Sequence, residues 1–129
     1  MKTYEVVAAI VVRDGKILAA QRGYGELQGG WEFPGGKIER GESREEALAR
    51  EMKEELDAEI SIDAFFQTVE YTYDDFHMTM HCYLGSIPDG HMALLEHSDA
   101  RWLGKDEVDA VDWLPADVAV VDALKERLS

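Results

Sequence analysis

The sequence predicts a single α+β domain over residues 1–129. Three observations support this prediction: apolar runs of strand length, turn signals between those runs, and two segments whose apolar residues recur at helical spacing. A length of 129 residues is usual for one domain, and the chain shows no internal repeat, low-complexity stretch or linker.

The N-terminal segment predicts a β-hairpin. Residues 4–12 form an apolar run rich in Val and Ile, which is typical of a buried strand. Asp14-Gly15 is a strong hairpin signal, and Ile17–Gln21 is the expected return strand. Residues 23–30 hold four glycines and predict a binding loop, whereas Trp31-Glu32-Phe33 is too short to predict a strand.

A helix is predicted to begin at Ser43. Ser43 and Glu46 have the spacing of a capping box, in which each side chain accepts a hydrogen bond from a free backbone N–H. The expected core stripe consists of Leu48, Met52 and Leu56. Asp57 is the expected end of the helix, although glycine is preferred there.

Two further strands are expected in the middle of the chain, at residues 60–72 and Phe76–Leu84, with a turn at Tyr73-Asp74-Asp75. In the first strand the alternating apolar residues are Ile60, Ile62, Ala64 and Phe66. In the second, Phe76, Met78, Met80 and Cys82 share one face, and His77, Thr79, His81 and Tyr83 share the other.

The C-terminal third predicts a loop over Gly85–Gly90, a short strand over Ala100–Leu103 and a short helix over Lys105–Asp109. A last helix is expected over Ala116–Leu128, with Pro115 at its start, where the missing N–H costs little. Its expected apolar stripe is Val118, Val121, Leu124 and Leu128.

Composition excludes several classes of function. The net charge of −14 disfavours duplex nucleic acid as a partner, since such binding relies on basic surface. Apolar runs stay shorter than the roughly 18 residues of a membrane span, and the N-terminus lacks a signal-peptide pattern. A lone cysteine, Cys82, rules out an intrachain disulfide, so a cytoplasmic location is expected.

Three carboxylates are the main candidates for a functional site. Glu51, Glu54 and Glu55 stand at i, i+3 and i+4 and share one helix face, where like charges repel each other. A hard divalent cation such as Mg²⁺ turns that repulsion into coordination, and it also binds phosphate oxygens. The pattern predicts a metal site for a phosphorylated substrate; a solvated acidic helix face is the alternative for an isolated E-x-x-E-E.

The loop and helix over residues 35–58 resemble the Nudix box. The matching positions are Gly36, Glu42, Arg50, Glu51, Met52, Glu54 and Glu55. Asp57 and Ala58 depart from the glycine and the larger aliphatic residue of the family pattern, which concerns helix termination and packing.

Three other stretches, EVVAAIVVRDGKILAAQR, WEFPGGKIERGES and LPAD, are similar to the MutT branch. The resemblance implies an α/β/α sandwich around a mixed sheet. It also implies removal of pyrophosphate from nucleoside triphosphates, with Mg²⁺ as cofactor and Mn²⁺ as the alternative ion.

The resemblance implies roles around the metal. Glu51, Glu54 and Glu55, with a backbone carbonyl of Gly35 or Gly36, are the expected ligands. Glu96, in the loop before the last strand, is expected as a further ligand or general base, with His97 and Asp99 as rivals. Arg50 is expected to orient a catalytic carboxylate, and Glu42 to anchor the loop or support the metal site.

Substrate contacts are also implied. Arg22 is expected at a phosphate, Lys37 at the leaving group, and Phe33, Tyr73 or Trp31 against the base, with surface or core positions as the alternatives. Asp117 is expected to face the base. Since an ionised aspartate only accepts hydrogen bonds, it favours a base edge with N–H donors. Cytosine and guanine, including 8-oxoguanine, both have them, so the base stays open.

Three functions compete. The first is a nucleoside triphosphate pyrophosphohydrolase acting on CTP, modified dCTP or 8-oxo-dGTP. The second is a hydrolase of nucleoside diphosphate derivatives or dinucleoside polyphosphates. The third is a non-catalytic nucleotide-binding module. A monomer and a homodimer are both compatible with the sequence.

Overall fold

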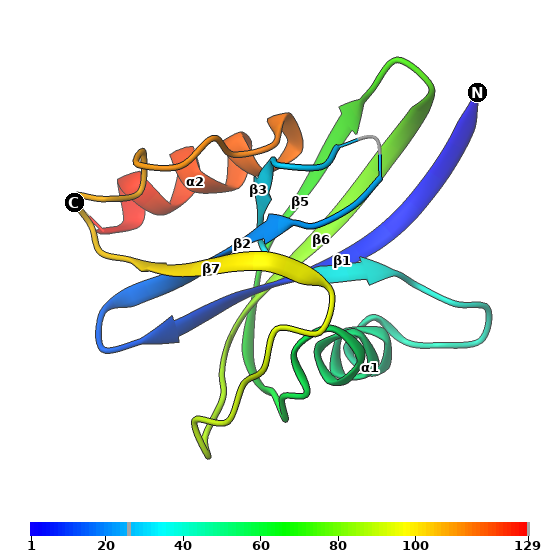
Figure 1. Cartoon of the computed structure of the whole chain (residues 1–129). Helices are drawn as coiled ribbons and strands as arrows, with labels where there is room; N and C mark the ends of the chain where they lie inside the picture. The colour runs from blue at the N-terminus through cyan, green and yellow to red at the C-terminus, as the bar shows by residue number, and fades with distance from the viewer. Residues whose placement is uncertain (26, 129) are drawn as a thin grey trace.

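The computed structural model describes residues 1–25 and 27–128, so Glu26 of the predicted 23–30 loop lies outside the described residues. A mixed sheet lies between two helices, one on each side (Figure 1). The elements are β1 (Lys2–Arg13), β2 (Lys16–Arg22), β3 (Trp31–Glu32), β4 (Gly35–Lys37), α1 (Arg44–Leu56), β5 (Ser61–Thr72), β6 (Phe76–Ser86), β7 (His97–Leu103) and α2 (Pro115–Leu128).

The sheet has the strand order β3-β2-β1-β6-β5, with β4 paired to β1 and β7 paired to β2. Only the pairing of β1 with β6 is parallel among the described strands. The predicted β1–β2 hairpin is confirmed, with Val12 opposite Ile17. Asp14 and Gly15 have φ angles of 51° and 77°, the left-handed values that a tight hairpin turn of this twist requires.

Alternation along β1 builds two cores, one on each face of the sheet. Ala8 and Ile10 pack with α2, whereas Val7, Ala9 and Val11 pack with α1. The predicted alternation of β6 is confirmed as well, since Met80 and Cys82 belong to the α2 side and Tyr83 to the α1 side. The α+β sandwich expected from the sequence is therefore confirmed.

Helix α1 begins and ends as predicted. The Ser43 hydroxyl accepts from the Glu46 N–H at 3.0 Å, and the Glu46 carboxylate accepts from the Ser43 N–H at 2.9 Å. Its stripe is fully buried: Leu48, Met52 and Leu56. Asp57 ends the helix at φ 51°, a left-handed conformation that costs a non-glycine residue roughly 1 kcal/mol. Ala58 is buried, so the smaller side chain still contributes to packing.

Strand β5 departs from the predicted alternation. Ile60 and Ile62 pack on the α1 side, whereas Phe66 packs on the α2 side. The register shifts between Ile62 and Ala64, and again between Phe65 and Gln67. Each bulge adds one residue to β5, so the side chains after it point to the opposite face of the sheet. A strict alternation of apolar residues in the sequence does not predict such a change.

Three predictions for the C-terminal third are wrong. Lys105–Asp109 forms turns rather than a helix, and β7 begins at His97, before the predicted start at residue 100. In α2, Val118 is 43% exposed, and Val120 takes its place in the core. The side chain of Leu128 lies outside the described residues.

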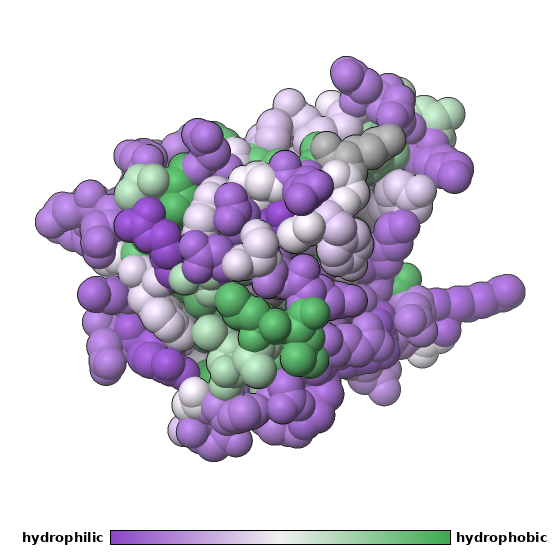
Figure 2. Space-filling model, in the orientation of Figure 1, coloured by the Kyte–Doolittle hydropathy of each residue, from purple (hydrophilic) through white to green (hydrophobic). Residues whose placement is uncertain are grey.

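The face of the molecule in Figure 2 is mainly hydrophilic, with one apolar patch below β7. Leu94 and Leu95, which precede β7, are among the exposed large apolar residues. Within residues 1–25 and 27–128, neither helix has the length and apolar character to cross a membrane.

Candidate active site

Five acidic residues line one open groove of about 970 Å³: Asp75, which lies between β5 and β6, and four glutamates. Glu51, Glu54 and Glu55 come from α1, and Glu96 comes from the segment before β7. Helical spacing places the first three together, while chain folding alone brings Glu96 to them. All four side chains that the sequence proposed as metal ligands thus line the same groove.

The glycine pair forms part of the groove wall and also forms strand β4, which the sequence did not predict. Gly35 lies opposite Ala8 and Gly36 opposite Val7. A Cβ on Gly35 would overlap the Val7 carbonyl oxygen, and a Cβ on Gly36 would overlap the Glu51 carboxylate. The close approach of backbone to β1 therefore requires glycine at position 35, whereas a side chain at position 36 would displace the Glu51 carboxylate.

Arg50 fixes several of these acids from behind the groove. Its guanidinium donates to Glu51 at 2.9 Å and to Glu54 at 3.2 Å. It also donates to Glu42 at 2.7 Å and to the Lys37 carbonyl at 2.9 Å. Glu42 in turn accepts from the Glu39 N–H at 2.8 Å. Arg50 and Glu42 thus contact the carboxylates and the loop, and neither is among the residues that line the groove.

Burial and mutual repulsion raise the pKa of two of the carboxylates. Desolvation raises the pKa of Glu55 to about 8, and the charges of Glu51, Glu32 and Glu96 add to that rise. Desolvation also raises the pKa of Glu51, although Arg50 opposes the change. A cation would replace the proton on such a site, since a metal binds the deprotonated carboxylate.

The donor set fits a hard divalent cation, because its oxygens come from carboxylates with backbone carbonyls beside them. Among the described residues, however, no three acidic or imidazole groups are already gathered into a ligand cluster. Arg50 holds Glu51 and Glu54, and Glu55 accepts from the Gly35 N–H at 3.0 Å.

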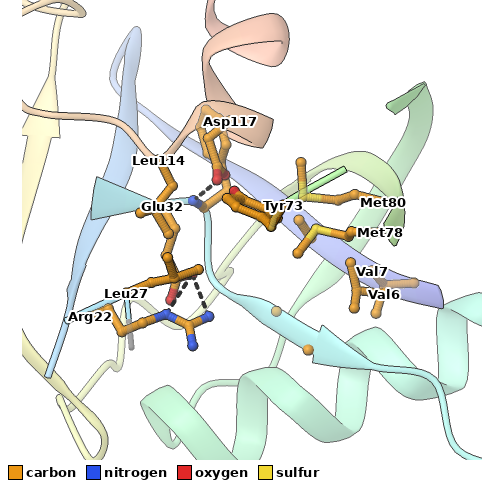
Figure 3. A pocket seen from close by; sticks show the side chains of 14 residues that line it. Val6, Val7, Arg22, Leu27, Glu32, Tyr73, Met78, Met80, Leu114 and Asp117 are labelled. Atoms are coloured by element: carbon orange, nitrogen blue, oxygen red, sulfur yellow. Dashed lines mark hydrogen bonds and ion pairs between the residues drawn. The ribbon is translucent and has the colours of Figure 1, made fainter. Parts of the chain in front are cut away.

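A second cavity of about 60 Å³ adjoins the groove and is shown in Figure 3. Its wall is mostly apolar. The lining includes Val6, Leu27, Phe33, Tyr73, Met78, Met80 and Leu114, with Arg22, Glu32 and Asp117 as the charged types. Arg22, Gly35 and Gly36 line both spaces, so the pocket opens beside the carboxylates.

Asp117 reaches from the first turn of α2 into this pocket (Figure 3). It is 4% exposed, and its Oδ1 accepts from the Phe33 N–H at 3.0 Å. Burial raises the pKa of Asp117 to about 8. A carboxyl group with this pKa is mainly protonated at pH 7, whereas the sequence analysis took Asp117 as ionised. The protonated group both donates and accepts hydrogen bonds.

Glu32 is a pocket residue that the sequence analysis missed. Its carboxylate accepts from Arg22 at 2.9 Å and pairs with His97 Nε2 at 3.0 Å (Figure 3 shows the Arg22 contact). The available signal was an acid set between Trp31 and Phe33, immediately before Pro34-Gly35-Gly36. Arg22 is thus oriented by Glu32 at the boundary of groove and pocket.

The other predicted contacts differ in position. Phe33 and Tyr73 both line the pocket, and Phe33 stacks on Trp113 with ring centroids 4.7 Å apart. Trp31 is buried and is not among the lining residues. Lys37 lines the groove, and its Nζ lies 4.0 Å from the centre of the Tyr4 ring.

Comparison with known proteins gives the family. Residues 3–127 match the NUDIX domain. The CTP pyrophosphohydrolase of Escherichia coli is 39% identical over 126 residues, which cover 95% of this chain and 92% of that protein. The putative 8-oxo-dGTP diphosphatase 2 of Mycobacterium tuberculosis is 38% identical, with 96% and 89% coverage.

A solved structure agrees with these relatives. The MutT protein of methicillin-resistant Staphylococcus aureus, a Nudix hydrolase, superposes with a TM-score of 0.79 at 36% identity, covering 98% of this chain and 99% of that one. Fold, site and sequence define a hydrolase with a row of helix carboxylates along its groove. The chain belongs to the Nudix family, as a MutT-like Nudix hydrolase, a class that generally uses divalent metal ions.

Proposed function

We propose that the chain is a Mg²⁺-dependent nucleoside triphosphate pyrophosphohydrolase that releases a nucleoside monophosphate and pyrophosphate. One observation carries the proposal: the groove lined by carboxylates and the apolar pocket share Arg22, Gly35 and Gly36 as wall. A nucleotide needs both surfaces at once, because its base is flat and largely apolar while its phosphates are anionic.

Glu51, Glu54, Glu55 and Glu96 hold the cation in this proposal, with a carbonyl of Gly35 or Gly36; Mn²⁺ is an alternative ion. The bound cation supplies neutralisation of phosphate charge and a template for the reacting groups. Phosphoryl chemistry depends mainly on such positioning and charge stabilisation, so few other protein groups are needed.

The residues of the chain perform the remaining tasks. Glu96 accepts a proton from a water molecule whose oxygen forms a bond to a phosphorus of the α,β-phosphoanhydride. The bridging P–O bond to that phosphorus breaks, and the monophosphate and pyrophosphate leave. Arg22 and Lys37 contact phosphate oxygens, and Lys37 also lies beside Tyr4 at the far end of the groove. Arg50 and Glu42 keep the carboxylates oriented through the hydrogen bonds described above.

The pocket holds the base. Phe33 and Tyr73 supply aromatic surface, while Asp117 and Glu32 supply polar groups within an apolar wall. Glu32 accepts hydrogen bonds, and protonated Asp117 both donates and accepts. Cytosine and guanine derivatives present both N–H donors and acceptors to these groups, as other bases also do, so the pocket alone does not select the proposed substrates, which are CTP, modified dCTP or 8-oxo-dGTP. The names of the related proteins agree with this range.

A second substrate class is favoured by the size of the groove. Besides the carboxylates, its lining includes Lys2, Tyr4 and Phe76, and its volume is about 970 Å³. That volume gives room for a group attached beyond the phosphates, as in a nucleoside diphosphate derivative or a dinucleoside polyphosphate. Such substrates give a monophosphate without free pyrophosphate, so the product separates the two classes.

The setting is proposed from the sequence. Cys82 is buried, and burial raises the pKa of its thiol to about 12, which suits a packing role in a reducing cytoplasm. We propose that residues 1–129 form one domain that acts without duplex nucleic acid, as a monomer or a homodimer.

The test is a panel of natural and oxidised triphosphates incubated with Mg²⁺, with separate detection of pyrophosphate and inorganic phosphate. Glu55→Gln should abolish pyrophosphate release. Glu59→Gln is the matched control, because Glu59 is an exposed acid that pairs with Lys53 and does not line the groove. Inorganic phosphate as the product, or equal losses in both variants, would contradict the proposal.

A further inference from the structure

The segment that carries Glu96 lies against the end of β2. Strands β2 and β7 pair with Gln21 opposite Asp99 and Arg22 opposite His97, so the register shifts between these two pairs. Gly23 follows Arg22 and comes directly against this irregular part of the pairing. The backbone from the Glu96 carbonyl to the Ser98 nitrogen is therefore in contact with the start of the 23–30 loop.

Gly23 permits this contact because it has no side chain. A Cβ on Gly23 would lie 2.8 Å from the Glu96 carbonyl oxygen and 3.3 Å from the Ser98 nitrogen. Both are backbone atoms and cannot rotate away. Gly23 is not among the glycines with a positive φ, so its backbone conformation does not call for glycine. The close approach to Glu96 is the physical reason for this residue.

The opposite side of the segment is fastened to α1. The Ala93 N–H donates to the Leu56 carbonyl at 2.7 Å, and the Leu95 N–H donates to the Glu55 carbonyl at 3.0 Å. These two bonds use carbonyls at the end of the helix that bears the carboxylates. These bonds therefore fix the position of the backbone next to Glu96 relative to Glu55, whose side chain lines the same groove.

His97 fixes the segment from its other end. Its ring is buried, and Nε2 lies 3.0 Å from the Glu32 carboxylate, which also accepts from Arg22. In the part of the chain that the structure describes, the buried Nδ1 has no hydrogen-bond partner. The Nε2 contact is thus the polar link between this ring and the β3 end of the pocket.

We infer that Gly23 and His97 are positioning residues, which hold Glu96 at the distance from the α1 carboxylates that hydrolysis requires. The inference rests on the proposed function, because it takes Glu96 to act in the reaction. Restoring an ordinary contact of about 3.4 Å at Gly23 moves the two backbones apart by roughly 0.6 Å. Displacements near 1 Å can cost about 10²-fold in rate.

The experiment is a double-mutant cycle on the triphosphate that the wild type hydrolyses fastest. Gly23→Ala should lower kcat about 10-fold or more and leave KM within about twofold. In a Glu96→Gln background, Gly23→Ala should alter kcat less than about twofold, because residue 96 no longer carries the carboxylate that takes part in hydrolysis. Gly104→Ala is the control, because Gly104 has no positive φ and the atom nearest to a Cβ there, the Glu107 Oε1 at 3.2 Å, ends a flexible side chain.

His97 gives a second, independent pair of variants. His97→Gln places an amide nitrogen where Nε2 lies and should retain most of the turnover, whereas His97→Asn is too short to reach Glu32 and should behave like Gly23→Ala. If Gly23→Ala fails to fold, the two His97 variants still test whether the backbone next to Glu96 has to be held in place for turnover.

Two outcomes overturn the inference. In the first outcome, Glu96→Gln lowers turnover, and the Gly23 and His97 variants lower kcat by the same factor in the Glu96→Gln background as in the wild type. The positioning role is then wrong, while the role of Glu96 stands. If Glu96→Gln turns over as fast as the wild type, the assigned role of Glu96 in the proposed function is wrong, and the inference fails with it.

Discussion

Replacing Asp117 by asparagine tests the electrostatics of the pocket. The carboxyl group is buried at the start of α2 and accepts from the Phe33 N–H. Asparagine has nearly the same shape, keeps an acceptor oxygen for that N–H, and stays neutral at every pH. The comparison therefore isolates the ionisation of one buried group.

The sign and the pH window follow from the pKa. Burial raises the pKa of Asp117 to about 8 from its ordinary value of 3.8. A raised carboxyl pKa gives stability that is complete below pH 3.8 and is lost as the pH rises through 8. The wild type should lose up to about 1.4 kcal/mol per pH unit in this window relative to Asp117→Asn, and the difference should level off above it.

The assay is urea unfolding of both proteins between pH 4 and pH 9. Asp122→Asn is the matched control, since Asp122 is an exposed acid on the same helix. Below pH 8 the base preference of Asp117→Asn should resemble that of the wild type, and above pH 8 the two should diverge. A stability difference that does not change with pH would refute the argument for a protonated Asp117.

Three other predictions concern the groove. In Arg50→Lys a single ammonium group cannot reach Glu42, Glu51 and the Lys37 carbonyl together, so turnover should fall about 10- to 100-fold. Arg40 is exposed, and Arg40→Lys should have no effect in the same steady-state assay. Gly36→Ala should push the Glu51 carboxylate aside and lower kcat by about 10²-fold, and a wild-type kcat would show that the glycine is dispensable. Glu55→Gln keeps an oxygen that accepts from the Gly35 N–H, so the variant should fold. Mg²⁺ at 100 Kd adds roughly 2.7 kcal/mol of stability to the wild type, and the variant should lose most of that gain in thermal unfolding with and without Mg²⁺. An equal gain in both proteins would show that Glu55 is not a ligand.

Local patterns predicted the elements whose causes are local. The Asp14-Gly15 turn and the Ser43–Glu46 capping box each depend on a few neighbouring residues, and both are present. The row of carboxylates on α1 follows from helical periodicity alone. These features could be predicted because nothing distant in the chain competes with them.

The features that the sequence did not predict depend on distant partners. Strand β4 exists because Gly35 and Gly36 lie against β1, and two glycines carry no strand pattern of their own. The raised pKa of Asp117 follows from its burial in the folded chain. Glu32 joins the pocket only because β2 and β7 bring Arg22 and His97 to it.

The central claim is that the carboxylates of α1 and the Asp117 pocket act on one nucleoside triphosphate. Phosphorus NMR of the complete reaction with Mg²⁺ tests it most directly. We predict that the triphosphate resonances give way to monophosphate and pyrophosphate in equal amounts, and that Glu55→Gln prevents the change. Conversion to a diphosphate and inorganic phosphate, or no conversion of any triphosphate in the panel, would contradict the account.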